Sequence, residues 1–189
     1  MIRFSYDSQK AEQEMRAVIF YLTTFGYIDG DFDQSEREFV AGYIQRLVAA
    51  RVEAAMPGAA SDLKVELTEK FTRHFLEVFE SIDQEVRDLF TESVADEEDQ
   101  ETFVHSRLKL RCFEIFQSFD AEGQEALMDT VDELLMADGV AHPAEVKFRA
   151  ELSALLEADM GVELLDSGAI ARLARSEEHT SELQSLTDI

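Results

Sequence analysis

Apolar residues recur along most of the chain at intervals of three and four, the spacing of amphipathic helices. The first stripe predicts a helix from about Ser8 to Tyr27, and the second predicts a helix that ends near Ala55. Similar stripes, several of them rich in phenylalanine, continue to Leu173, and we expect them to form the core. Only 2 prolines and 8 glycines interrupt the chain. The pattern predicts an all-α fold, a single-domain antiparallel bundle of about seven to eight helices over residues 1–174.

Capping residues mark the boundaries of these helices. Gly30 follows Asp29 at the end of the first stripe, where a left-handed glycine commonly ends a helix. Asp33 and Glu36 stand three positions apart at the start of the second stripe, the spacing of a capping box. Further predicted boundary residues are Ser61 and Asp120 as N-caps and Pro143 at a first helical position.

The middle of the chain leaves one alternative open. The stripe that starts at Ser61 has a second candidate start at Ser81, so it fits either one bent helix or two helices. An acidic run at 96–99 precedes the next stripe, where it suits a helix N-terminus. The last helix is expected over 162–173.

An internal repeat relates the two ends of the domain. Shifting the sequence by 109 positions, the difference between 138 and 29, places Asp29-Gly30 on Asp138-Gly139 and Glu36 on Glu145. Each half is then a helix, an Asp-Gly loop and a second helix, and a bundle can bring the two loops together. The two repeat units span about 15–55 and 127–157.

The loops carry the candidate chemistry. Clustered carboxylates are the ligands of hard cations, so the pattern indicates a divalent site of the Ca²⁺ or Mg²⁺ class. The candidate ligands are Asp29, Asp31, Asp33, Glu36, Asp138 and Glu145, with His142 as an auxiliary ligand. The same acids can instead only tie down loops and cap helices. Phe25, Tyr27 and Phe32 flank the first loop and can line a groove for a partner.

Several familiar sites are excluded in their usual form. An EF-hand needs glycine and glutamate where this loop has Gln34 and Val40. No histidine follows a glutamate by three positions, as a di-metal bundle requires, and no glycine-rich phosphate loop occurs. His105 and Cys112 are about two helical turns apart, which disfavours a nucleophile with its base. We expect no enzyme, with metal-dependent hydrolysis as the enzymatic alternative.

The net charge of the chain limits which classes of molecule it can bind. The chain has 41 acidic and 17 basic side chains and a net charge of −24, which repels nucleic acid and anionic membranes and favours cations or basic proteins. Cys112 has no partner for a disulfide, and no apolar run is long enough to insert into a membrane. We expect a cytoplasmic protein with protein partners.

The last residues have a different character. Residues 175–185 resemble the in-frame translation of a common sequencing adapter, and residues 175–189 lack apolar periodicity. We expect 175–189 to be a non-native tail and the authentic C-terminus to be missing beyond Ala174.

The two loops resemble those of the TerB-like family of bacterial tellurite-resistance proteins, whose domain also begins a membrane-anchored DnaJ-type co-chaperone. The matching residues are Ile28-Asp29-Gly30 with Glu36, and Met136-Ala137-Asp138-Gly139 followed by His142-Pro143-Ala144-Glu145. The first copy departs from the family pattern by the extra acids Asp31 and Asp33, and the copies are farther apart than usual. The resemblance implies an all-helical stress-response accessory or scaffold domain that binds a cation through its acidic loops. The alternative is a metal-free protein-interaction module like that of the co-chaperone.

Overall fold

The computed structural model of the protein describes residues 2–30, 32–95, 107–137, 139 and 142–155. The chain divides into two units, 1–149 and 150–189, and the contacts discussed below all lie within the first. The described residues form helices and no strand, which confirms the all-α class. None of the described helices is long and apolar enough to cross a bilayer.

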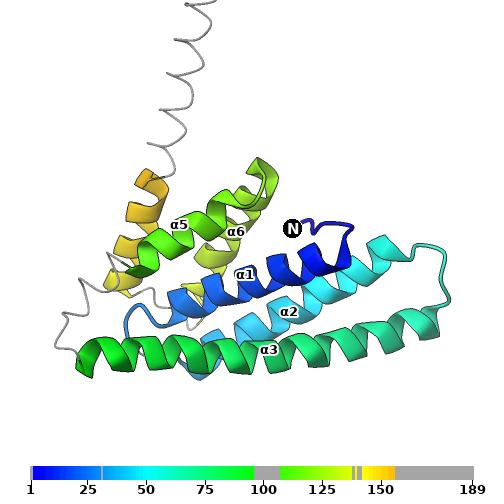
Figure 1. Ribbon diagram of the computed structural model, residues 1–189, viewed down its shortest axis with the longest axis horizontal. Coiled ribbons are helices and arrows are strands. Elements are labelled where there is room, and N and C mark those ends of the chain that lie inside the picture. Colours follow the sequence, from blue (N-terminus) through cyan, green and yellow to red (C-terminus); the bar gives the residue numbers. More distant parts are fainter. Residues whose placement is uncertain (1, 31, 96–106, 138, 140–141, 156–189) are drawn as a thin grey trace, which may run out of the picture. The chain divides into compact units, whose positions relative to one another are not determined.

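Six helices occur in the described part of the chain (Figure 1). They are α1 (Ser8–Gly26), α2 (Gln34–Ala55), α3 (Ser61–Ala95), α5 (Lys109–Gln117), α6 (Ala121–Leu134) and a helix over 143–155. This is fewer than the seven to eight predicted for residues 1–174, and the stripe with two candidate starts forms the single helix α3. Neither glycine nor proline occurs between Ser61 and Ala95, so nothing interrupts the helix at Ser81. The helix expected over 162–173, the acidic run at 96–99 and the tail lie outside the described residues.

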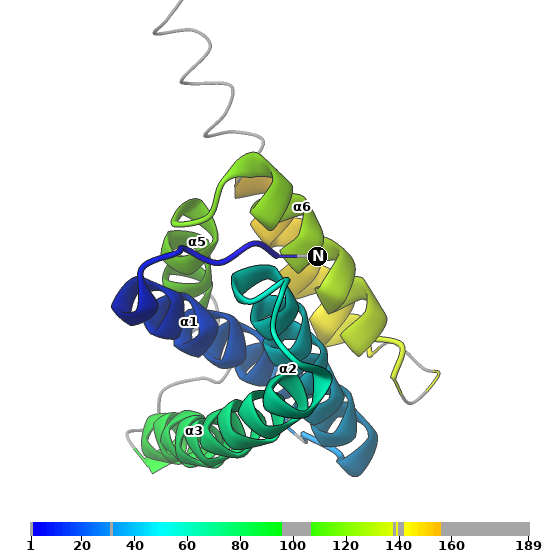
Figure 2. The same ribbon diagram turned by 90° about the vertical axis from the view of Figure 1, so that its right-hand side faces the viewer.

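The helix α1 packs against four of the other described helices. It contacts α2 and α3 on one side and α5 and α6 on the other, an arrangement that Figure 2 shows end-on. Its second half is correspondingly buried all round, including the polar Thr23 and Thr24 as well as Tyr21, Leu22 and Phe25. A helix that is buried on all faces is a core helix rather than an amphipathic surface helix. The fold is therefore built around the C-terminal half of α1.

The caps match the sequence in most places. Asp33 caps α2 and forms a complete capping box with Glu36, and the Asp120 side chain accepts a hydrogen bond from the backbone N–H of Gly123 at 2.8 Å at the start of α6. The prediction that Ser61 caps α3 is wrong by one residue. The backbone N–H of Lys64 donates to the carbonyl of Ala60, so Ser61 is already the first helical residue.

The two halves of α3 differ in burial. Val78, Phe79, Ile82, Asp83 and Val86 are buried in its second half, whereas no residue from 61 to 77 is buried. Leu63 and Phe71, which we expected in the core, are 41% and 42% exposed. The apolar stripe continues along the whole helix, but its first half is incompletely covered by α1 and α2.

Alanine substitutions at two glycines, Gly26 and Gly42, test how closely the chain packs at each position. At Gly26 an added Cβ would overlap the ring of the buried Phe32, whereas at Gly42, inside α2, the nearest atom would be 3.7 Å away. We expect Gly26→Ala to lower the free energy of unfolding by about 1–3 kcal/mol through overpacking. Gly42→Ala should raise it by up to about 1 kcal/mol through helix propensity. Urea denaturation measures both, and a neutral Gly26→Ala would contradict the close packing of Phe32 on α1.

Candidate acidic site

Both Asp-Gly loops contain a glycine in the left-handed region. Gly30 has a φ of 96° and Gly139 a φ of 88°, a conformation that side chains other than glycine adopt at a cost. In each loop the backbone N–H of the glycine donates to a carbonyl three residues earlier, that of Tyr27 or of Met136. At its glycine, each loop thus turns the chain in the same local way.

Each loop is followed by a helix whose third residue is a capping glutamate. The Oε2 atom of Glu36 accepts from the backbone N–H of Asp33 at 2.9 Å, and Oε2 of Glu145 accepts from the backbone N–H of His142 at 2.9 Å. In the first loop the bond is reciprocal, because Oδ1 of Asp33 accepts from the N–H of Glu36 at 2.9 Å. Capping by both glutamates was the purely structural interpretation of the sequence, and both caps form.

The two glutamates are also brought together in space. Phe25, at the end of α1, packs edge-on against Phe148, one turn after Glu145, with ring centroids 4.9 Å apart. The carboxyls of Glu36 and Glu145 lie close enough for each to influence the pKa of the other, and the two residues are only 7% and 4% exposed. Carboxyls from opposite ends of the domain therefore share one buried site.

The pair is held in an environment that disfavours its charge. Burial, followed by the charges of Glu145, Asp33 and Asp29, raises the pKa of Glu36 from 4.5 to about 8, although the hydrogen bond from Asp33 opposes the shift. Burial also raises the pKa of Glu145. The charge of Asp29 adds to this increase, and the backbone hydrogen bond from His142 opposes it. Two adjacent carboxyls of this kind retain one proton between them at neutral pH.

Asp83 is a third buried acid, and positively charged side chains compensate its charge. Oδ1 of Asp83, in α3, lies 2.8 Å from the guanidinium of Arg37, and Oδ2 lies 3.0 Å from that of Arg87. The Tyr27 hydroxyl donates to Asp83 at 2.8 Å, and despite burial these groups lower the pKa of Asp83. Among the described residues neither Glu36 nor Glu145 has an ion pair with an arginine or a lysine. The carboxyl pair is the buried charge that the described chain leaves uncompensated.

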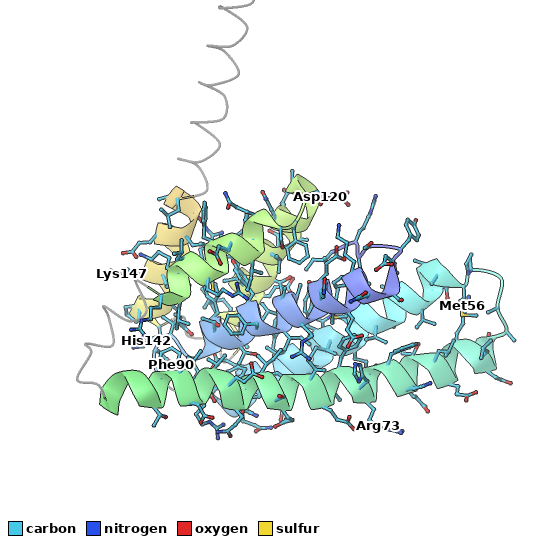
Figure 3. The ribbon with its side chains drawn as sticks, viewed as in Figure 1. Met56, Arg73, Phe90, Asp120, His142 and Lys147 are labelled. Carbon is cyan, nitrogen blue, oxygen red and sulfur yellow. The ribbon has the colours of Figure 1, made fainter. Side chains whose placement is uncertain are left out.

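The other predicted ligands fall into three groups. Asp29 is exposed and Asp33 is half-buried, and both are close enough to raise the pKa of Glu36. His142 is exposed, and its Nδ1 accepts from the backbone N–H of Ala144 at 3.3 Å. Figure 3 places its label beside the end of the fold where α1 enters its loop. Asp31 and Asp138 lie outside the described residues. Within the described ranges, no three His, Cys, Asp or Glu side chains form a group that could hold a metal ion.

The expected partner groove around the first loop is wrong. Phe25, Tyr27 and Phe32 are buried, and Phe32 packs against Phe79 of α3 with ring centroids 6.1 Å apart. Tyr27 turns inwards to the polar cluster around Asp83, to which its hydroxyl donates a hydrogen bond. That cluster was missed in the sequence, where the spacing of four between Asp83 and Arg87 was its only visible sign.

The candidate nucleophile is unsuited to chemistry. Cys112 is fully buried in α5, and burial raises the pKa of its thiol. A thiol without access to solvent and without a thiolate form at neutral pH is a core side chain. His105, seven residues before Cys112 in the sequence, lies outside the described residues.

No model of a protein family, no curated protein and no solved structure matches this chain.

Replacing Glu36 by glutamine tests the shared proton. Folding raises the pKa of Glu36 from 4.5 to about 8, so between these values the folded protein binds a proton that the unfolded chain has released. The associated stability is complete below this window and is lost as pH rises through it. We expect Glu36→Gln to gain about 1–3 kcal/mol of unfolding free energy relative to wild type between pH 5 and pH 8. Urea denaturation in chelator measures the difference.

The control is Glu66→Gln, which removes a carboxylate from an exposed position of α3. Its unfolding free energy should keep a constant difference from wild type over the same pH range. Parallel pH profiles for Glu36→Gln and wild type would show that Glu36 ionises normally.

Proposed function

We propose that this protein is a TerB-like helical module that binds a divalent cation between its two Asp-Gly loops. It acts as a non-enzymatic accessory or scaffold component of a bacterial stress response in the cytoplasm. The observation that carries the proposal is the buried contact between the carboxyls of Glu36 and Glu145. The two halves of the internal repeat supply one glutamate each.

The chemistry of the site favours a hard cation. Buried carboxyls are stable when they are paired with positive charge or protonated. In the part of the chain that the structure describes, no arginine or lysine forms an ion pair with Glu36 or Glu145. A divalent cation that replaces the shared proton would neutralise both carboxylates at once. The candidate donors around it are carboxylate oxygens, which suit Ca²⁺ and Mg²⁺. Asp29 and Asp33 stand beside the pair, and Asp31 and Asp138 belong to the same loops by sequence.

Cation binding at such a site must compete with the proton. Because the pKa of Glu36 is about 8, the pair still holds a proton at neutral pH, and the cation would have to displace it. Affinity should therefore rise with pH up to about 8. A capping role alone gives no reason for such a proton release.

The second candidate is a metal-free protein-interaction module of the co-chaperone type. Its support is that Oε2 of each glutamate already caps a helix, and that the described residues contain no group of three ligands. In this function the pair stays protonated, and the loops only shape the end of the bundle. A partner complex that forms equally well in chelator favours this module over the cation site.

Calorimetric titration of the full chain with Ca²⁺, Mg²⁺, Mn²⁺ and Zn²⁺ tests the proposal. We expect saturable binding by wild type that is weakened about tenfold or more by Glu145→Gln, because a buried ligand charge is lost. Glu66→Gln, an exposed change of the same charge, should bind like wild type.

Proton release supplies an independent measurement. Titration in two buffers of different ionisation enthalpy should give different apparent heats at pH 7, and the difference should vanish in Glu36→Gln. Absence of binding by wild type at millimolar cation would contradict the cation site and favour the metal-free module.

A further inference from the structure

The far end of the three-helix layer contains an apolar cavity. It has a volume of about 310 Å³ and lies between α1, the C-terminal half of α2 and the first half of α3. Met15, Val48, Val52, Leu67, Phe71 and Phe75 line it. Figure 3 labels Met56, another lining residue, where α2 leads into α3. This volume is at the lower limit of ordinary small-molecule sites, which are also mostly apolar.

The cavity explains the uneven burial of α3. Leu67, Phe71 and Phe75 recur every four residues along the first half of α3 and face the cavity, yet none of them is buried. In the second half of the helix the corresponding side chains are covered by α1 and α2. The first half presents an apolar wall that Met15, Val48 and Val52, across the cavity, do not cover completely. A hydrocarbon in the cavity would provide that cover.

Arg51 is a positively charged residue of the cavity lining, and it indicates which polar group a ligand would carry. Arg51, in α2, has no carboxylate partner among the described residues, in a chain with 41 acidic side chains. Its Nη1 donates to the carbonyl of Phe4 at 3.2 Å, and its guanidinium lies 5.8 Å from the ring of the exposed Tyr6. The other ionisable groups of the lining, Glu12 and His74, already face each other at 3.4 Å. An arginine beside an apolar cavity is suited to a carboxylate.

We propose that this cavity binds a medium-chain fatty acid, with the hydrocarbon chain between α1, α2 and α3 and the carboxylate on Arg51. The net charge of −24 opposes a second copy of the chain as the occupant, because like-charged molecules repel. It is compatible with a single carboxylate that meets an arginine directly. The N-terminal arm contributes Phe4 to the lining, so the ligand would also contact this arm.

The experiment titrates the full chain with dodecanoic acid below its micelle concentration, and with 1-dodecanol as the uncharged match. We expect saturable binding of the acid and weaker binding of the alcohol. Arg51→Gln should weaken binding of the acid about tenfold, the loss of one charge-assisted interaction, and leave the alcohol unchanged. Ala55→Trp, at an exposed position that lines the cavity, should abolish binding of both by filling it.

The matched control is Arg73→Gln, which removes a cation from α3 on the side away from α1 and α2 (Figure 3). It should bind dodecanoic acid like wild type, and circular dichroism should show equal helix content in all variants. Lack of saturable binding by wild type, or binding that survives Ala55→Trp, would overturn the proposal. Equal affinity of Arg51→Gln and wild type for the acid would overturn the role of the arginine. Dimerisation in sedimentation that Ala55→Trp abolishes would identify the cavity as a self-association face instead.

Discussion

The edge-on contact between Phe25 and Phe148 joins the two ends of the domain, and the acidic site depends on it. Phe25 stands in the C-terminal half of α1, which is buried on all sides, and its position is fixed by the packing of this helix against α2, α3, α5 and α6. Phe148 follows the second loop and is itself buried. A buried aromatic side chain removes on the order of 150–250 Å² from water. The free energy gained by burying these two rings can offset the cost of burying the Glu36 and Glu145 carboxyls side by side.

The buried acids differ in how far neighbouring positive charge compensates them. Asp83 is surrounded by Arg37, Arg87 and the hydroxyl of Tyr27, so its charge is compensated where it lies. Glu36 and Glu145 receive hydrogen bonds from backbone N–H groups at two helix starts, which fixes their positions but supplies little charge. Helix starts attract negative charge, yet the effect is modest compared with burial beside a second carboxyl. The two carboxyls thus have hydrogen-bond donors at this site, but their negative charge is not compensated within the described residues.

The sequence predicted most reliably what depends on neighbours in the chain. The capping box of Asp33 and Glu36, the cap at Asp120 and the end of the first helix follow from side chains and backbone groups within a few residues. The repeat made convergence of Glu36 and Glu145 a hypothesis, but only Phe25 and Phe148, a tertiary contact, bring them together. The Asp83 cluster combines residues of α2 and α3 with Tyr27, the residue after α1, and no local pattern defines such a set. The incomplete cover of α3 was missed because periodicity indicates which face is apolar and not what lies against it.

The helix α2 links the two sites while keeping them electrostatically separate. Glu36 lies in its first turn and Arg51 near its C-terminal end, and 15 residues of helix span about 22 Å. This exceeds the screening length of about 8 Å at physiological ionic strength, so the charge state of one site has little direct effect on the other. A coupling between them would have to pass through movement of α2 as a rigid rod against α1 and α3. The tight approach of Gly26 and Phe32 and the Arg37–Asp83 ion pair hold the first turns of α2, whereas its last turns border the cavity. Any adjustment of α2 to a ligand is therefore expected at its C-terminal end.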